Sequence, residues 1–182
     1  MKTSRQGPLV VYRSGRLYWY GCFLLRVLLG AIPIVADGSA SALGGSSLDP
    51  TNFGTKIDNP WFPLTPGTIL TFEGTKENKH AIRVFSVTSR TTVIEGVTCV
   101  VVEDSVSLGG SPAERALAYY AQDRQGSVWL FGEDSQDIEH GRVVKNEGWQ
   151  AGTDGALPSF FMEAAPTIGH SFTFSPGRFQ FR

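Results

Sequence analysis

The sequence contains little cysteine and histidine and no long hydrophobic run. It has two cysteines, Cys22 and Cys99, and three histidines among 182 residues. Neither H-E-x-x-H nor C-x-x-C occurs, which argues against a zinc site. The nucleophile motif G-x-S-x-G is also missing, which argues against serine acyl transfer. Because Cys22 falls in a predicted leader, no internal disulfide is expected, and Cys99 is predicted to be a small buried hydrophobic residue.

The N-terminal segment has the three parts of a secretory signal peptide. Residues 1–26 hold five basic side chains and no acidic one; the uncharged apolar run Val27 to Ala36 and the small-residue stretch Ala40 to Ala42 follow. Ten apolar residues would rise about 15 Å as a helix, about half of a bilayer core, so no stable membrane span is expected after cleavage. We predict a signal peptide over 1–42 and export to the medium, periplasm or cell envelope; an uncleaved anchor is the alternative.

The net charge of the chain after the leader argues against polyanionic partners. Cleavage would remove five of the sixteen basic residues and one of the seventeen acidic ones, which leaves a formal charge of −5. The remaining basic residues form no cluster, so neither nucleic acid nor an anionic membrane surface is expected as a partner. Residues 43–60 are rich in glycine, serine, asparagine and aspartate, which predicts a flexible lead-in over 43–57.

From residue 68 onward the hydrophobic pattern has a period of two, and no stretch keeps a helical pattern for three turns. Strands are expected over 68–72, 81–88, 91–94, 97–106, 115–122, 127–132, 142–145, 171–174 and 179–181, and loops over 74–80 and 146–169. Glu95-Gly96 and Asp123 to Gly126 are predicted turns. The run Cys99 to Val102 is apolar on both faces, which predicts a central strand. The fold class is therefore all-β, an antiparallel sandwich or a barrel or half-barrel, in one domain over 58–182.

Four segments resemble a family of uncharacterised bacterial exported proteins. They read DNPWFPLxPGT (58–68), GVTCVVV (96–102), YAQDxxGxVWxFGED (120–134) and WxAGxDGA (149–156). The resemblance covers residues 58 to 169 and implies a secreted β domain with no assigned activity. It also implies further strands, so this chain could be a truncated or frame-shifted copy that lacks C-terminal strands.

Aromatic side chains form the first candidate site. Alternation places Trp129 and Phe131 on one face of their strand, and one of Tyr119 and Tyr120 should share that face across the turn. Aromatic rings on a sheet can stack on sugars or line an apolar cavity, and they also commonly build the core. The candidate ligand-binding residues are Trp129, Phe131, Tyr120 and Trp61.

Carboxylates form the second candidate site. Glu133, Asp134, Asp137 and Glu139 follow a predicted strand, on a segment expected to be a loop. Calcium accepts six to eight oxygen ligands, so a calcium site is one interpretation, although the spacing is not that of an EF-hand. A solvated acidic turn explains the same pattern. Glu133 and Asp134 could instead be the carboxylate pair of a secreted hydrolase.

These observations favour a non-catalytic exported domain that binds an apolar or saccharide ligand, or an envelope protein or glycan. A secreted hydrolase that uses the acidic segment is the first alternative. A purely structural or interaction module is the second. No cofactor other than calcium is expected.

Overall fold

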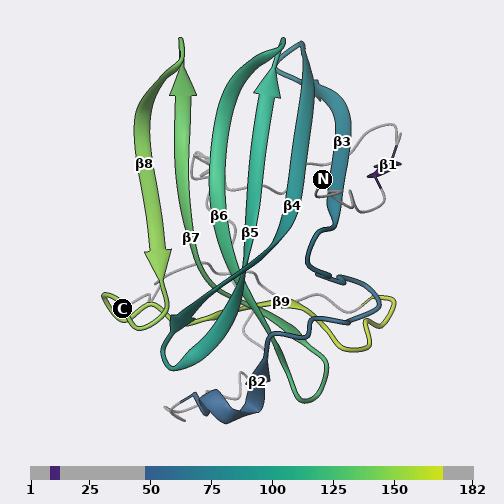
Figure 1. Cartoon of the computed structure of the whole chain (residues 1–182), viewed down its shortest axis with the longest axis vertical. Coiled ribbons are helices and arrows are strands. Elements are labelled where there is room, and N and C mark those ends of the chain that lie inside the picture. The colour runs from purple at the N-terminus through teal and green to yellow at the C-terminus, as the bar shows by residue number, and fades with distance from the viewer. Residues whose placement is uncertain (1–8, 13–47, 170–182) are drawn as a thin grey trace, which may run out of the picture.

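The computed structural model describes residues 9–12 and 48–169, and these residues form strands almost throughout. The elements are β1 (Leu9–Tyr12), η1 (Pro50–Asn52), β2 (Phe53–Gly54), β3 (Ile69–Lys76), β4 (Lys79–Ile94), β5 (Val97–Leu108), β6 (Ser111–Asp123), β7 (Val128–Glu139), β8 (Arg142–Gln150) and β9 (Ser159–Met162). Strands β3 to β8 pair in chain order as one antiparallel sheet that curls into a half-barrel (Figure 1). The all-β prediction is confirmed, and of the architectures considered the half-barrel is observed.

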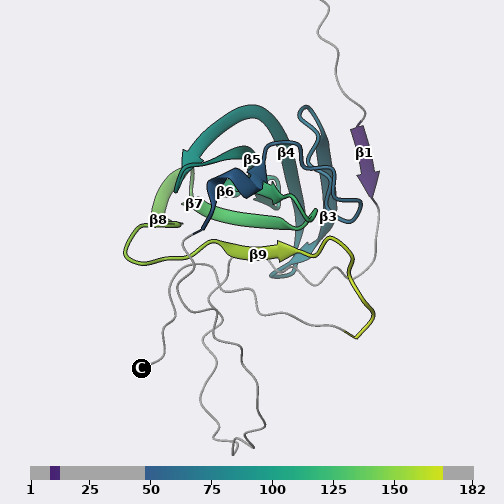
Figure 2. The ribbon, with the colours of Figure 1, turned by 90° about the horizontal axis from the view of Figure 1, so that it is seen from below.

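Three short strands join this sheet by other pairings. β1 lies parallel to β3, β2 pairs with the end of β6, and β9 pairs with the start of β7. Seen from below, β9 runs across the open side of the curled sheet (Figure 2). The predicted strands over 171–174 and 179–181, most of the predicted leader and residues 43–47 of the lead-in lie outside the described residues. Within those residues no helix is long and apolar enough to cross a membrane.

Four hairpins close with two-residue turns in which both residues have positive φ. The turns are Glu77-Asn78 (53° and 60°), Glu95-Gly96 (49° and 76°), Gly109-Gly110 (57° and 83°) and His140-Gly141 (50° and 74°). Such type I′ turns match the right-handed twist of the strands that they join. The predicted turn at Glu95-Gly96 is therefore confirmed. Because strands alternate in direction, the turns at 77–78, 109–110 and 140–141 meet at one end of the half-barrel, which we name the turn end.

Several strands are longer than the sequence pattern predicts. The expected strands over 81–88 and 91–94 are one strand, β4, with a register shift between Val87 and Thr91. The predicted loop over 74–80 shrinks to the turn at 77–78, since β3 continues to Lys76 and β4 begins at Lys79. The acidic segment over 133–139 is part of β7 rather than a loop. β8 continues to Gln150, into a region predicted to be irregular.

One face of the sheet gathers side chains from all six strands of the half-barrel, and we call it the inner face. Only the concave side of a curled sheet can bring β3 and β8 into one cluster. Its core includes Val102 and Leu130, and the loop over 57–64 and β9 close it from the other side through Phe62 and Phe161. The buried members of this cluster are Ile57, Leu64, Phe85, Val87, Val100, Val102, Ala118, Tyr120, Val128 and Leu130.

The opposite, outer face has a second core at the end away from the turn end. Cys99, Val101 and Phe131 are buried there, under Leu48 and Phe53. Cys99 is fully buried, as predicted, and burial raises the pKa of its thiol to about 12. Central β5 is thus covered on both faces, which confirms the prediction made from residues 99–102.

The described part of the predicted flexible lead-in, residues 48–57, is folded onto the sheet. Asp49 caps η1 by accepting a hydrogen bond from the Thr51 backbone N–H. The Phe53 ring then stacks edge-on against Phe131 and Trp129. The prediction of a flexible lead-in did not foresee these contacts, which cover a part of the outer core that the six strands leave open.

Asn59 fastens this N-terminal segment to the sheet. Its side-chain amide donates to the backbone oxygens of Gly126 (2.7 Å) and Glu163 (2.9 Å), and its side-chain oxygen accepts from the backbone N–H of Trp61 (2.8 Å) and Phe62 (3.1 Å). The residue is 2% exposed. Asparagine supplies two donors and one acceptor from a short side chain, so it joins three separate segments at one point.

Replacing Asn59 with alanine is expected to lower the free energy of unfolding by about 3 kcal/mol, because buried partners are left without hydrogen bonds. Urea denaturation followed by tryptophan fluorescence measures the change. Asn146→Ala, on exposed β8, is the matched control and should cost less than about 0.5 kcal/mol. Equal losses for the two variants would show that Asn59 does not fasten the segment.

Candidate functional site

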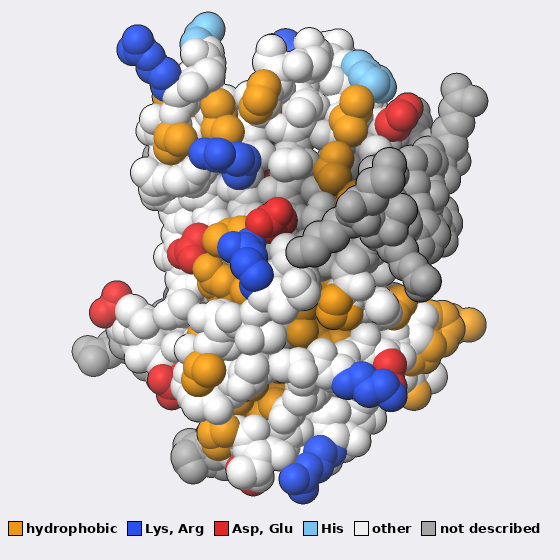
Figure 3. Space-filling view, viewed as in Figure 1, with side chains coloured by type: hydrophobic (Ala, Val, Ile, Leu, Met, Phe, Trp, Pro, Cys, Tyr) orange, Lys and Arg blue, Asp and Glu red, His pale blue; other side chains and the backbone are white. Residues whose placement is uncertain are grey.

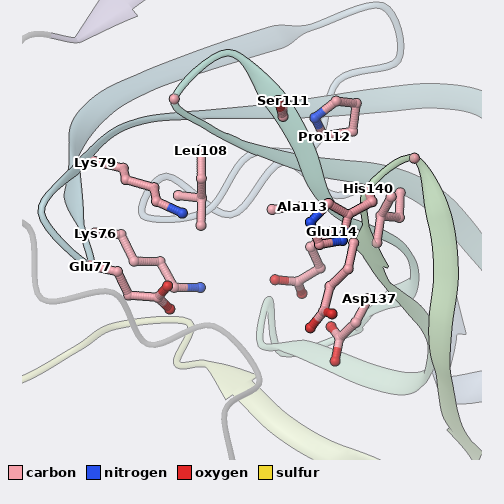
Figure 4. A pocket seen from close by; sticks show the side chains of 14 residues that line it. Lys76, Glu77, Lys79, Leu108, Ser111, Pro112, Ala113, Glu114, Asp137 and His140 are labelled. Atoms are coloured by element: carbon pink, nitrogen blue, oxygen red, sulfur yellow. The ribbon is translucent and has the colours of Figure 1, made fainter.

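The turn end of the half-barrel contains a hollow of about 1050 Å³. We call it the mouth hollow. It is lined by residues of the three hairpins that meet there, and its volume lies at the upper end of the range for small-ligand pockets. The lining residues are Lys76, Glu77, Lys79, Leu108, Gly109, Ser111, Pro112, Ala113, Glu114, Asp137, Ile138, Glu139, His140 and Gly141. Figure 4 shows the lysines on one side of the hollow and Glu114 and Asp137 on the other.

The first wall of the mouth hollow is basic. Lys76 ends β3 and Lys79 begins β4, and the two residues are directly opposite in the antiparallel register. Lys76 is four residues after Phe72, and Lys79 is four residues before Arg83. Alternation therefore places both lysine side chains on the inner face of the sheet, as for Phe72 and Arg83. The tight turn at 77–78 forces this pairing of like charges.

The second wall is acidic. Glu114 on β6 is directly opposite Asp137 on β7, and both belong to the inner face. Side chains that face each other in this way have Cβ atoms about 5 Å apart. Burial is the main cause that raises the pKa of the Glu114 carboxyl, and the positive charge of Lys76 opposes the shift. The negative charge of Asp137 adds to the increase, so a positive charge placed beside this wall would be stabilised.

A partly buried ion pair lies between the mouth hollow and the apolar inner core. Arg83 Nε donates to both carboxylate oxygens of Asp104, at 2.9 and 2.8 Å, and a guanidinium NH₂ group contacts the same carboxylate. Burial by itself lowers the pKa of Arg83, but the hydrogen bonds and charge of Asp104 raise it overall. The inner face therefore changes from apolar to charged along its length.

The predicted aromatic set does not form one site. Trp129 and Phe131 share the outer face as predicted. The tyrosine that joins them is Tyr119, because it is two residues from Ala121, the residue opposite Trp129. Tyr120 belongs instead to the inner core, and Trp61 is 62% exposed.

The contacts of Trp129 leave little of its ring for a ligand. Its Nε1–H donates to Asp123 Oδ2 at 2.9 Å, and its ring packs edge-on against Phe53 and Phe160. Asp123 also accepts from the backbone N–H of Ser127 and begins the predicted turn to Gly126, whose φ of 94° confirms the left-handed last residue. These contacts assign Trp129 to the packing of the turn and the outer core.

The four predicted acidic residues are spread along β7. Glu133 is on the inner face opposite Ala118, whereas Asp134 points outward and accepts a hydrogen bond from the Tyr119 hydroxyl. Glu133 and Asp137 are four strand residues apart, about 13 Å. Glu139 is exposed beside the turn at 140–141. No group of three or more metal-ligating side chains occurs in the described part of the chain.

A shallower groove of about 490 Å³ crosses the outer face. Its residues include Arg115, which donates to Gln136 Oε1 at 2.8 Å, and Glu103, which is paired with Arg90. On the face seen in Figure 3, apolar side chains occur in small separate groups between polar and charged ones. The groove is a polar sheet surface whose charged groups already have partners within the fold.

No family model, no curated protein and no solved structure matches this chain. The family resemblance therefore stays a prediction from the four motifs. Residues of two of these motifs make structural contacts. In the segment 58–68, Asn59 donates a hydrogen bond to Gly126 and the Phe62 ring packs against Tyr120. In the segment 120–134, Trp129 donates a hydrogen bond to Asp123.

Of the residues that line the mouth hollow, the sequence analysis named Asp137 and Glu139, but as calcium ligands. The lysine pair had a readable signal, because Lys76 and Lys79 flank a two-residue polar turn. Glu114 had none. Its pairing with Asp137 depends on the register shift between Tyr119 and Tyr120 in the pairing of β6 with β7.

Proposed function

We propose that this chain is a non-catalytic binding domain that holds a small polar ligand in the mouth hollow and acts outside the cytoplasm after loss of its leader. The observation that carries the proposal is a hollow of about 1050 Å³ with charged walls at the solvent-facing end of a closed core. A saccharide or another polar envelope component falls within this class. Export is supported by the basic, apolar and small-residue order of residues 1–42.

Two of the other functions have less support. The hydrolase alternative needs Glu133 and Asp134 on one side of a cleft, but they occupy opposite faces of β7. An apolar ligand held by the aromatic set would need Trp129 to face a cavity, but its ring is packed against Phe53 and Phe160. A structural module remains the outcome to be tested against binding.

Chemical-shift mapping tests the binding proposal. The ¹⁵N-labelled protein is titrated with glycine, spermidine, succinate and glucose at millimolar concentration. At least one probe is expected to shift the amides of Lys79, Leu108 and Glu139. Ser111→Trp should fill the hollow and abolish these shifts, whereas Thr98→Trp, an exposed site away from the turn end on neighbouring β5, should preserve them. Shifts confined to other regions, or none with any probe, would favour the structural module.

Export has its own measurement. Mass spectrometry of the product recovered outside the cytoplasm should give an N-terminus at or near residue 43. A recovered product that still begins at Met1 contradicts cleavage, and a product found only inside the cell contradicts export.

A further inference from the structure

The strand β1 occupies one edge of the half-barrel. Its residues Leu9–Tyr12 pair in parallel with residues 69–72 at the start of β3, without a break in register. Figure 2 shows β1 beside β3, outside the curled sheet. Because β1 belongs to the predicted leader, cleavage near residue 42 would remove it. The mature chain would then expose an edge of β3 that has a partner strand in the uncleaved chain.

The backbone of β3 presents hydrogen-bonding groups to this edge at alternate residues. The Val87 N–H donates to the Thr68 oxygen at 2.9 Å, which directs the backbone groups of residue 68 towards β4. Because this orientation alternates along a strand, the N–H and C=O groups of Ile69 and Thr71 point away from β4, towards β1. Without a neighbouring strand, such groups are a template for pairing with another chain.

The start of β3 lacks the features that protect edge strands. Residues 69–72 include no charged residue and no proline, and their pairing with β4 has no register shift. Leu70 and Phe72 pack against the inner core, whereas Ile69 is 41% exposed. A strand added here would place alternate side chains beside Leu70 and Phe72, so apolar residues at those positions would extend the inner core.

The opposite edge of the half-barrel is protected. β8 carries the charged residues Arg142, Lys145 and Glu147, and its pairing with β7 has a register shift. Charges and bulges on an edge strand oppose pairing with another chain. Among the described residues, the sheet thus has one edge suited to strand addition and one edge that resists it.

We propose that the β3 edge over residues 69–72 is a strand-addition site for an extended, uncharged segment of another protein, and that Leu9–Tyr12 fills this site while the leader is attached. Main-chain hydrogen bonds supply the affinity, and apolar side chains at alternate positions supply the selectivity. The seated strand is parallel, whereas two β3 edges in a two-fold dimer would be antiparallel, so the occupant is a separate segment rather than a second copy. The site is separate from the mouth hollow, so either proposal can fail alone.

A fluorescent peptide with the sequence of residues 7–14 tests the proposal by anisotropy against the full chain. Val10→Pro with Val11→Pro in the chain removes N–H donors from β1 and frees the edge, so this proline variant should bind the peptide. The wild type should bind it about tenfold more weakly or worse, because its tethered β1 competes at an effective concentration in the millimolar range. Val10→Thr with Val11→Thr, which keeps the donors and the β-branching, should behave like the wild type.

Amide shifts locate the bound peptide. In the ¹⁵N-labelled proline variant, the peptide should shift the amides of Ile69 and Thr71 and leave those of Lys145 and Glu147 on β8 unchanged. Thr71→Pro, added to that variant, removes an outward N–H and should abolish binding, whereas Thr71→Val should preserve it. Ser111→Trp, which fills the mouth hollow, should leave peptide binding unchanged.

The outcomes separate the two proposals. If the proline variant does not bind the peptide, or binds it with shifts confined to other strands, the β3 edge is not a strand-addition site. If that variant forms a dimer in light scattering and the dimer excludes the peptide, the edge pairs with a second copy and the assigned partner is wrong. Peptide binding at Ile69 and Thr71 in a protein whose hollow binds no small molecule supports the edge site and contradicts the function proposed for the hollow.

Discussion

Replacing Val102 with aspartate is expected to unfold the domain. Val102 is 0% exposed, at the centre of the inner core, and its strand is covered on both faces. A buried carboxylate without a partner costs several kcal/mol, and the cavity left by the lost apolar contacts adds to that. A domain of this size has a total stability of about 5–15 kcal/mol, so most or all of it is lost.

Circular dichroism and thermal unfolding of the Val102→Asp protein measure this effect. Thr98→Asp is the control, because it adds the same charge to the same strand at an exposed position. The control should melt within a few degrees of the wild type. A Val102→Asp protein that also melts normally would mean that β5 is not the centre of the fold.

Breaking the ion pair between Arg83 and Asp104 is expected to give the second largest decrease in the free energy of unfolding. The two side chains are 27% and 14% exposed, so solvent screens them little. Arg83→Met leaves the Asp104 carboxylate partly buried and uncompensated, at an expected cost of about 3 kcal/mol. The double variant Arg83→Met with Asp104→Leu should recover most of that loss, because no charge is then left behind.

A double-mutant cycle, with the free energy of unfolding measured in urea, gives the interaction energy between the two side chains. The expected signature is a strongly destabilised Arg83→Met, a destabilised Asp104→Leu, and a double variant more stable than either. A single Arg83→Met that costs less than about 1 kcal/mol would instead indicate a solvent-screened pair of the surface type. Glu103→Gln, which removes the exposed partner of Arg90, is the surface control.

Features that depend on local pattern could be predicted from the order of the residues. Period-two alternation predicted β5 nearly to its ends and β6 from Arg115 onward, and the apolar run from Cys99 to Val102 predicted a strand covered on both faces. The turns at Glu95-Gly96 and at Asp123 to Gly126 were also readable, because glycine there accepts the positive φ that each turn needs. These features depend on residues that are neighbours in the sequence, so the local order of residue types is sufficient to predict them.

Hydrophobic alternation did not predict the parts of the strands that extend beyond the core. β4 continues through Ser89 and Arg90, β7 continues through the acidic segment, and almost all of β8 is exposed. Hydrophobic alternation reports burial rather than backbone pairing. At a solvated end of a half-barrel both faces of a strand can be polar while the hydrogen-bond ladder continues, so the sequence there resembles a loop.

Which residues share a site depends on the pairing of strands in the folded sheet. A shift of one residue in register moves a side chain to the other face of the sheet. Alternation along β6 places Tyr120, opposite Leu130, on the inner face and Ala121, opposite Trp129, on the outer face. The register shift between Tyr119 and Tyr120 brings Glu114 opposite Asp137 in the mouth hollow, where an unshifted pairing would place Gln136. Residues 23 positions apart are placed together by hydrogen bonds and bulges of the folded sheet, which leave no mark in either local segment.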